Sequence, residues 1–176
     1  MTRIVAIISG IVAVVVATSI GASAQTAANR VGENTDWSVF VAENPTECWI
    51  VSAPKKTVNT RNGKVVAVNR GDTLLFVTFR PGDKVRGEVS FTGGYPFKQG
   101  TFVTIRIDKS SYKMFVDGEW AWPATRDDDA KVTTSMKRGR TAVVTGVSSR
   151  GTKTEDTFSL LGFTAALQEA EKRCGG

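Results

Sequence analysis

Short stretches of alternating apolar and polar residues, separated by turn residues at intervals of about ten positions, constrain the fold of this chain most. Alternation with a period of two is typical of strands that bury one face. It is clear in residues 48–52, 103–107 and 112–116. Turn dipeptides such as Asn62-Gly63 and Asp117-Gly118 separate the stretches. The pattern predicts a mainly β domain, either a sandwich or a barrel.

Two stretches follow the helical period instead. Residues 127–138 begin with three aspartates and end with two basic residues before Gly139, which suits the electrostatics of helix ends. A calcium site is the alternative for the aspartates, but they lack the alternate spacing of an EF-hand loop. Residues 163–174 place an apolar stripe and Cys174 on one face. We therefore expect two short helices, one of them C-terminal.

The first 24 residues have the features of a cleaved signal peptide. A basic residue at position 3 precedes an apolar run over residues 4–20, and Ala22-Ser23-Ala24 fits a signal peptidase site. An uncleaved membrane anchor is the alternative, since 17 residues lie at the lower limit for a span. We expect a flexible lead-in at residues 25–36, one domain at 37–176 and no integral membrane span after cleavage.

The sequence has two cysteines, Cys48 and Cys174, and export would place them in an oxidising compartment. An even pair in an oxidising compartment predicts a disulfide, and only one connectivity exists. The bond would fix the C-terminal helix to the strand around Cys48. Two unpaired buried thiols remain the alternative.

Composition removes several kinds of chemistry. The chain has no histidine, which excludes Ser-His-Asp and Cys-His catalysis and histidine-ligated zinc. None of the Walker, Rossmann, HExxH or GxSxG motifs occurs. We expect a non-enzymatic protein without a metal or cofactor. The alternative is an envelope-polymer hydrolase that uses a Ser-Lys pair or carboxylates, with the following acids as candidates: Asp83, Glu88, Asp117 and Glu119.

Basic residues give the chain a net charge of +6. An exported basic domain favours anionic partners such as lipopolysaccharide phosphates, acidic glycans or an acidic protein face, rather than nucleic acid. Ordinary solvated loops are the alternative explanation. The candidate surface for an anionic partner consists of two clusters of basic residues: Arg80, Lys84 and Arg86, and Lys137, Arg138 and Arg140.

Aromatic residues allow two interpretations. Trp120 and Trp122 alternate after the predicted hairpin turn, so they share one face, either an inner wall of the core or an exposed shelf for a ligand. We expect the core. Trp37 and Trp49 lie in predicted strands and are also expected in the core. The loop at residues 91–97 is rich in glycine and aromatic residues and suits either a packed corner or a contact surface.

Several motifs in one order closely resemble the invasion associated locus B family of exported alphaproteobacterial proteins. The resemblance runs from about Trp37 to Cys174 and rests on these segments: Gly94-Tyr95-Pro96-Phe97, residues 115–122, Ser149-Arg150-Gly151-Thr152, residues 156–160 and residues 162–167. It implies an immunoglobulin-like β-sandwich in the periplasm or at the outer membrane, with Cys48 and Cys174 as the disulfide ends.

The family takes its name from members that help bacteria to enter host cells, and the resemblance brings no catalytic residues. Together the observations predict an exported binding or envelope-support protein, with host-cell invasion or adhesion as a further role. Its partner would be an envelope or host component.

Overall fold

Strands make up most of the structure, a computed structural model that describes residues 29–44 and 46–174. Within these residues the chain forms twelve strands, one 3₁₀ turn and two α-helices. In chain order they are β1 (Asn29–Asn34), β2 (Trp37–Ala42), β3 (Glu47–Ser52), β4 (Lys56–Arg61), β5 (Lys64–Val65), β6 (Leu74–Arg80), η1 (Pro81–Asp83), β7 (Val85–Thr92), β8 (Phe102–Ile107), β9 (Ser110–Asp117), β10 (Trp120–Trp122), α1 (Arg126–Arg138), β11 (Thr141–Val147), β12 (Lys153–Ser159) and α2 (Phe163–Arg173).

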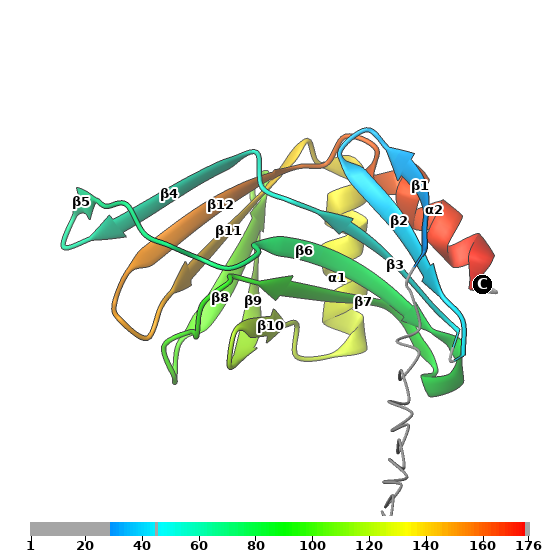
Figure 1. Ribbon diagram of the computed structural model, residues 1–176, viewed down its shortest axis with the longest axis horizontal. Helices are drawn as coiled ribbons and strands as arrows, with labels where there is room; N and C mark the ends of the chain where they lie inside the picture. Colours follow the sequence, from blue (N-terminus) through cyan, green and yellow to red (C-terminus); the bar gives the residue numbers. More distant parts are fainter. Residues whose placement is uncertain (1–28, 45, 175–176) are drawn as a thin grey trace, which may run out of the picture.

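All twelve strands belong to one antiparallel sheet in the order β1-β2-β3-β6-β7-β10-β9-β8-β11-β12-β4-β5. The chain leaves β3 for the far edge, where β4 pairs with β12, and returns with β6 beside β3. Figure 1 shows β4, β5 and β12 at one end of the molecule and β1, β2 and α2 at the other. The mainly β class and the two helices are thus confirmed. The sheet is compatible with an immunoglobulin-like sandwich, which stays a prediction.

The hydrophobic core lies against one face of the sheet and is completed by both helices. In β3, Cys48 and Ile50 point into the core, whereas Trp49 between them lies on the opposite face. Helix α2 packs its buried side against β2 and β3, where Phe163 meets the ring of Trp37 edge-on at 5.0 Å between centroids. Burial of each such large side chain stabilises the fold by about 1.5–3 kcal/mol.

The disulfide is confirmed. Cys48 in β3 is bonded to Cys174, which directly follows α2, with 5.9 Å between the Cα atoms. Both cysteines are buried, and neither is a free thiol. The bond therefore fixes the C-terminal helix to the centre of the β2-β3-β6 part of the sheet, as the helical spacing of Cys174 predicts.

Strand β1 differs from the flexible lead-in that we expected over residues 25–36. Residues 29–34 pair with β2 through a two-residue turn at Thr35 and Asp36. The sequence gives little sign of this strand because its pairing uses backbone groups, and only Val31 packs against the core. The predicted signal peptide, residues 1–24, lies outside the described residues. In the described part of the chain, no helix is long and apolar enough to cross a membrane.

Helix α1 begins and ends as its charges predict. Thr125 caps it, with its hydroxyl accepting the backbone N–H of Asp128 at 3.2 Å. Two of the three aspartates have structural partners, since Asp128 forms an ion pair with Lys131 and Asp129 accepts the backbone N–H of Val89 in β7. These contacts support helix-end electrostatics rather than a calcium site.

Asp129 makes the stability of the fold sensitive to pH. Burial, reinforced by the nearby charges of Glu88 and Asp128 and opposed by the hydrogen bond from Val89, raises the pKa of Asp129 to about 6. A carboxyl group whose pKa is higher in the folded than in the unfolded state destabilises the fold as the pH rises from about 4 to about 6. At neutral pH, Asp129 therefore lowers the free energy of unfolding.

We expect Asp129→Asn to raise the free energy of unfolding at pH 7 by about 1 kcal/mol, after allowance for solvent screening, because the amide still accepts the hydrogen bond from Val89. The gain should vanish toward about pH 3, below the ordinary pKa of 3.8, where the wild-type carboxyl is largely protonated in both states. Asp128→Asn is the matched control, because bonds from Lys131 and Thr125 lower the pKa of Asp128. It should destabilise the fold at pH 7. Urea unfolding at both pH values measures the free energy of unfolding of each variant. Changes of the same sign for the two variants at pH 7 would contradict the prediction.

Candidate functional site

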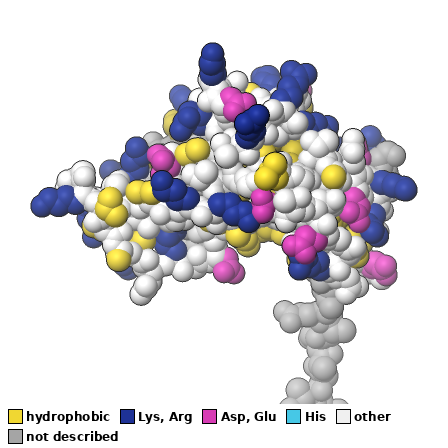
Figure 2. All heavy atoms as spheres, turned by 90° about the horizontal axis from the view of Figure 1, so that it is seen from above, with side chains coloured by type: hydrophobic (Ala, Val, Ile, Leu, Met, Phe, Trp, Pro, Cys, Tyr) yellow, Lys and Arg dark blue, Asp and Glu magenta, His cyan; other side chains and the backbone are white. Residues whose placement is uncertain are grey.

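The two clusters of the predicted anionic-partner surface lie apart. Arg80, Lys84 and Arg86 surround the turn between β6 and β7, whereas Lys137, Arg138 and Arg140 lie at and just after the end of α1. Figure 1 shows these two places at opposite heights of the molecule. In Figure 2, Lys and Arg side chains are spread over the upper face with Asp and Glu between them.

Arg80 is also occupied by acidic neighbours. Its guanidinium lies 3.3 Å from the carboxylate of Glu47, 2.8 Å from that of Glu88 and 3.7 Å from that of Asp83. An arginine held by three carboxylates has little charge left for an anionic ligand. Of the first cluster, only Lys84 and Arg86 are exposed without such contacts among the described residues.

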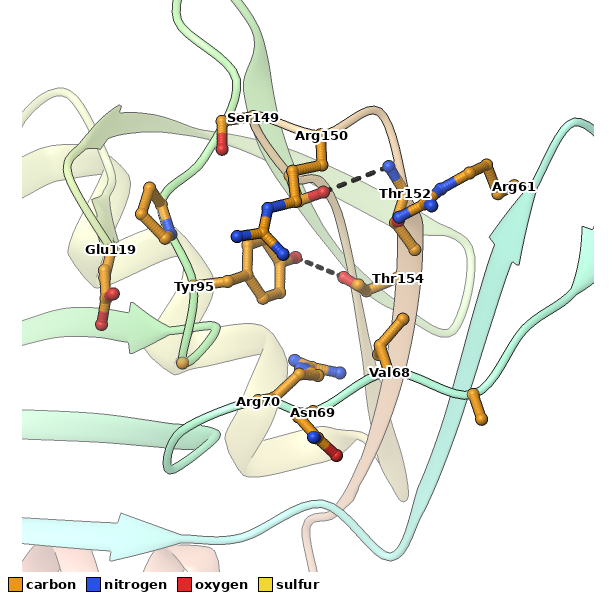
Figure 3. Close-up of a pocket in the computed structure, with 14 residues that line it drawn as sticks. Arg61, Val68, Asn69, Arg70, Tyr95, Glu119, Ser149, Arg150, Thr152 and Thr154 are labelled. Carbon is orange, nitrogen blue, oxygen red and sulfur yellow. Dashed lines mark hydrogen bonds between the residues drawn. The ribbon is translucent and has the colours of Figure 1, made fainter.

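A different set of arginines lines a pocket of about 520 Å³, which we call the arginine pocket. It is formed where the end of β4, the segment before β6, the loop after β7 and the turn between β11 and β12 come together (Figure 3). Charged and hydroxyl side chains give it a polar character: Arg61, Asn69, Arg70, Tyr95, Glu119, Ser148, Ser149, Arg150, Thr152 and Thr154.

A buried ion pair lies at one wall of the pocket. The guanidinium of Arg70, 9% exposed, donates to both carboxylate oxygens of Asp156, 0% exposed, at 2.9 and 2.7 Å. Thr57 donates a further hydrogen bond to Asp156 at 2.7 Å, and the Nε of Arg70 donates to the carbonyl of Gly93 at 2.9 Å. Such a two-pronged, charge-assisted pair fixes both side chains in place. It holds the loop after β7 against β12.

Tyr95 lies between Arg70 of this ion pair and Arg150 (Figure 3). The guanidinium of Arg70 lies 5.0 Å from the centroid of the Tyr95 ring, a cation–π contact. The hydroxyl of Tyr95 is hydrogen-bonded to that of Thr154 in β12. Burial raises the pKa of the Tyr95 phenol, so the hydroxyl stays protonated at neutral pH. Tyr95 is thus a fixed, uncharged part of the wall.

Two exposed arginines stand at the rim. The guanidinium of Arg61 donates to the hydroxyl of Thr152 at 2.6 and 3.1 Å, and Figure 3 shows Arg150 reaching over Tyr95 from the β11–β12 turn that also carries Thr152. Neither arginine forms an ion pair within residues 29–44 and 46–174. Glu119 is the acidic side chain in the lining. Planar guanidinium groups bind phosphate, sulfate or carboxylate in two-pronged fashion, so the rim suits an anionic group.

The acids considered for a hydrolase lie elsewhere in the fold, apart from Glu119. Asp83 and Glu88 both contact Arg80, and Asp117 precedes Gly118 in the turn between β9 and β10. No group of three or more cysteine or acidic side chains in the described part of the chain is placed to hold a metal ion.

Trp120, Trp122 and Trp49 correct our expectation that they lie in the core. In β10 the buried residue is Ala121, so both tryptophans point to the outer face of the sheet, and Trp120 is 39% exposed. Alternation shows that Trp120 and Trp122 share a face but not which face is buried. Trp37 is in the core as expected. The loop at residues 91–97 is a packed corner in part, since Phe91 and Phe97 are buried.

Sequence reasoning missed Arg70 and Asp156 as a pair. One signal was present, because Asp156 lies between Thr154 and Phe158 on the side of β12 that faces the core. A charged residue at a buried strand position requires a partner. The sequence does not show which residue that partner is, because Arg70 and Asp156 are 86 positions apart and meet only in the folded protein.

Comparison with known proteins identifies a family. A family model described as "Invasion associated locus B (IalB) protein" matches residues 37–171. None of the curated proteins or solved structures matches the chain. Three of the segments that resemble this family in sequence, residues 94–97, 115–122 and 149–152, supply residues to the lining of the arginine pocket, and a fourth supplies Asp156 beside it.

Proposed function

The chain belongs to the invasion associated locus B family, and from this premise we propose that it is a non-enzymatic binding protein of the bacterial cell envelope. Its place would be the periplasm or the outer-membrane surface, after removal of residues 1–24. A buried disulfide supports export, because such bonds persist in oxidising compartments. The ligand would be an anionic group of an envelope component, bound in the arginine pocket.

The observation that carries this proposal is the arrangement of Arg61 and Arg150. Both side chains line one preformed hollow, whose wall also includes the hydroxyls of Ser149 and Thr152. Arg70 is neutralised by Asp156, so it stiffens the wall rather than binding the ligand. A phosphate or carboxylate group would bring its charge to the two rim arginines and accept hydrogen bonds from the hydroxyls.

Binding rather than catalysis fits the state of the groups in the pocket. General acid–base catalysis needs a group whose pKa lies near the working pH. Histidine is absent from the sequence, Arg70 and Asp156 are locked together, and the pKa of Tyr95 is raised away from neutrality. The proposal would give way to a hydrolase if envelope polymers were cleaved and Glu119→Gln abolished the turnover.

Salt dependence tests the proposed binding. We expect the protein to bind immobilised lipopolysaccharide, and its affinity to fall by about tenfold or more between about 0.05 M and about 0.5 M NaCl, because exposed charges are screened. Heparan sulfate, an anionic glycan of host surfaces, is the second probe. Stronger binding to lipopolysaccharide supports the envelope role, whereas stronger binding to heparan sulfate would favour host adhesion. Affinity unaffected by salt for both probes would contradict the proposal.

Charge-matched variants locate the site. The double variant Arg61→Gln, Arg150→Gln should weaken binding to lipopolysaccharide by about tenfold or more, through loss of charge-assisted hydrogen bonds. The control is Lys137→Gln, Arg138→Gln at the end of α1, which removes the same charge from the other candidate cluster. It should change the affinity by less than about threefold. A larger effect of the control would place the ligand at α1 instead.

A further inference from the structure

The outer face of the sheet carries an open groove of about 560 Å³, which we call the aromatic groove. Its lining comes from adjacent strands β3, β6, β7 and β10, on the side of the sheet opposite the core. Four aromatic residues form it together with a few polar ones: Trp49, Phe76, Trp120 and Trp122, with Glu47, Thr78, Arg80, Glu88 and Ser90. The groove is separate from the arginine pocket, although Trp120 directly follows Glu119.

The aromatic surface continues beyond the groove as a row. Phe76 lies 5.6 Å from Trp120, and Trp120 stacks on Trp122 at 6.1 Å with 20° between the ring planes. Trp122 is directly opposite Phe115 in β9, and Phe115 is opposite Phe102 in β8. Phe115 is 50% exposed and Phe102 43% exposed. A row of partly exposed aromatic rings across neighbouring strands marks a contact surface.

Polar groups beside the rings define the chemistry of the ligand. Glu47 and Glu88 bracket Arg80, so two carboxylates and one guanidinium face the groove. The excess of negative charge here disfavours an anionic ligand, in contrast to the arginine pocket. Ionised carboxylates only accept hydrogen bonds, and a guanidinium only donates them. A ligand that fits must therefore donate and accept hydrogen bonds at neighbouring groups. It must also have an apolar surface that packs against flat aromatic rings.

We propose that the aromatic groove binds an uncharged glycan chain. The faces of sugar rings that carry C–H groups would stack on Trp120 and Trp122, as apolar surfaces do on large aromatic rings. Sugar hydroxyls donate and accept, so neighbouring hydroxyls match the alternating groups of Glu47, Arg80 and Glu88. A proline-rich peptide also fits aromatic grooves, but its backbone offers mainly carbonyl acceptors, which the two carboxylates repel.

Titration with the hexasaccharide of N-acetylglucosamine tests this proposal. We expect saturable heat in calorimetry and a change in tryptophan emission, because three of the four tryptophans line the groove. Trp120→Ala should weaken binding by about tenfold. Glu88→Gln, which retains the aromatic surface, should weaken it by about threefold or more. The two variants together keep the test valid if one of them unfolds.

Two controls complete the experiment. Leu161→Ala removes another exposed apolar side chain outside the groove and should leave the affinity unchanged. Arg61→Gln, Arg150→Gln should also leave it unchanged, which separates this proposal from the anion-binding one. The proposal would be overturned if the hexasaccharide did not bind, or if Trp120→Ala and Glu88→Gln both bound it as tightly as the wild type does. Tighter binding of a proline-rich decapeptide than of the hexasaccharide would also overturn it.

Discussion

Replacing Arg70 with methionine is expected to lower the free energy of unfolding by about 3–5 kcal/mol, because Asp156 is then left buried without its counter-charge. Asp156 is inaccessible to solvent and receives two hydrogen bonds from Arg70. One bond from Thr57 remains, which does not compensate a buried negative charge. Chemical denaturation of Arg70→Met and the wild type at neutral pH measures the difference.

The double variant Arg70→Met, Asp156→Leu separates the loss of the ion pair from the cost of leaving one buried charge without its partner. It should recover most of the lost stability, since apolar replacements of a buried ion pair are often neutral. Arg173→Met is the surface control, because Arg173 pairs with Glu169 in partly exposed positions of α2, and it should cost less than about 1 kcal/mol. A single variant as stable as the wild type would show that Asp156 does not depend on Arg70.

Removal of the disulfide is expected to lower the free energy of unfolding by about 4–5 kcal/mol, because Cys48 and Cys174 close a loop with a sequence separation of 126 residues. The effect is large beside a total stability of about 5–15 kcal/mol for a typical domain. The double variant Cys48→Ala, Cys174→Ala, compared with the wild type by urea unfolding without reductant, measures it.

Reduction provides the matched comparison. Dithiothreitol should destabilise the wild type toward the level of the double alanine variant, and it should leave that variant unaffected. Proteolysis should then begin at α2, which the disulfide holds against β3. A wild type that loses less than about 1 kcal/mol on full reduction would contradict the entropic account.

Much of the fold could be predicted because local chemistry and tertiary structure agree. The Asp117-Gly118 hairpin forms as expected, with Gly118 at a φ of 57° and Trp120 paired with Asp117. Gly151, at a φ of 80°, likewise serves the turn between β11 and β12. Strands with a clear alternation, such as β3 and β8, were identified for the same reason.

The edges of the sheet were predicted less well. At one edge only Lys64 and Val65 form β5, and β4 at Lys56–Arg61 was not expected. Both strands are largely exposed and are held by backbone pairing, which leaves little apolar pattern to detect. Strand β1 was missed for this reason too.

The candidate sites depend on tertiary structure to a greater degree. Arg61, Tyr95 and Arg150 come from separate segments, and nothing in their local sequence shows that these segments meet. The basic clusters stood out by their density along the chain, yet the folded molecule places them apart and pairs Arg80 with acids. The density of basic residues along the sequence therefore predicts a binding site less well than the position of a basic side chain beside a pocket in the folded protein.

The binding of an anionic group between Arg61 and Arg150 is the central claim, and chemical-shift mapping tests it most directly. The ¹⁵N-labelled protein would be titrated with inorganic phosphate, as a probe of the phosphates of lipopolysaccharide. We predict saturable shifts of the amides of residues 149–152 and of the side-chain Nε–H signals of Arg61 and Arg150. Shifts confined to residues 137–140, or no saturable shift at the arginine pocket, would contradict the claim.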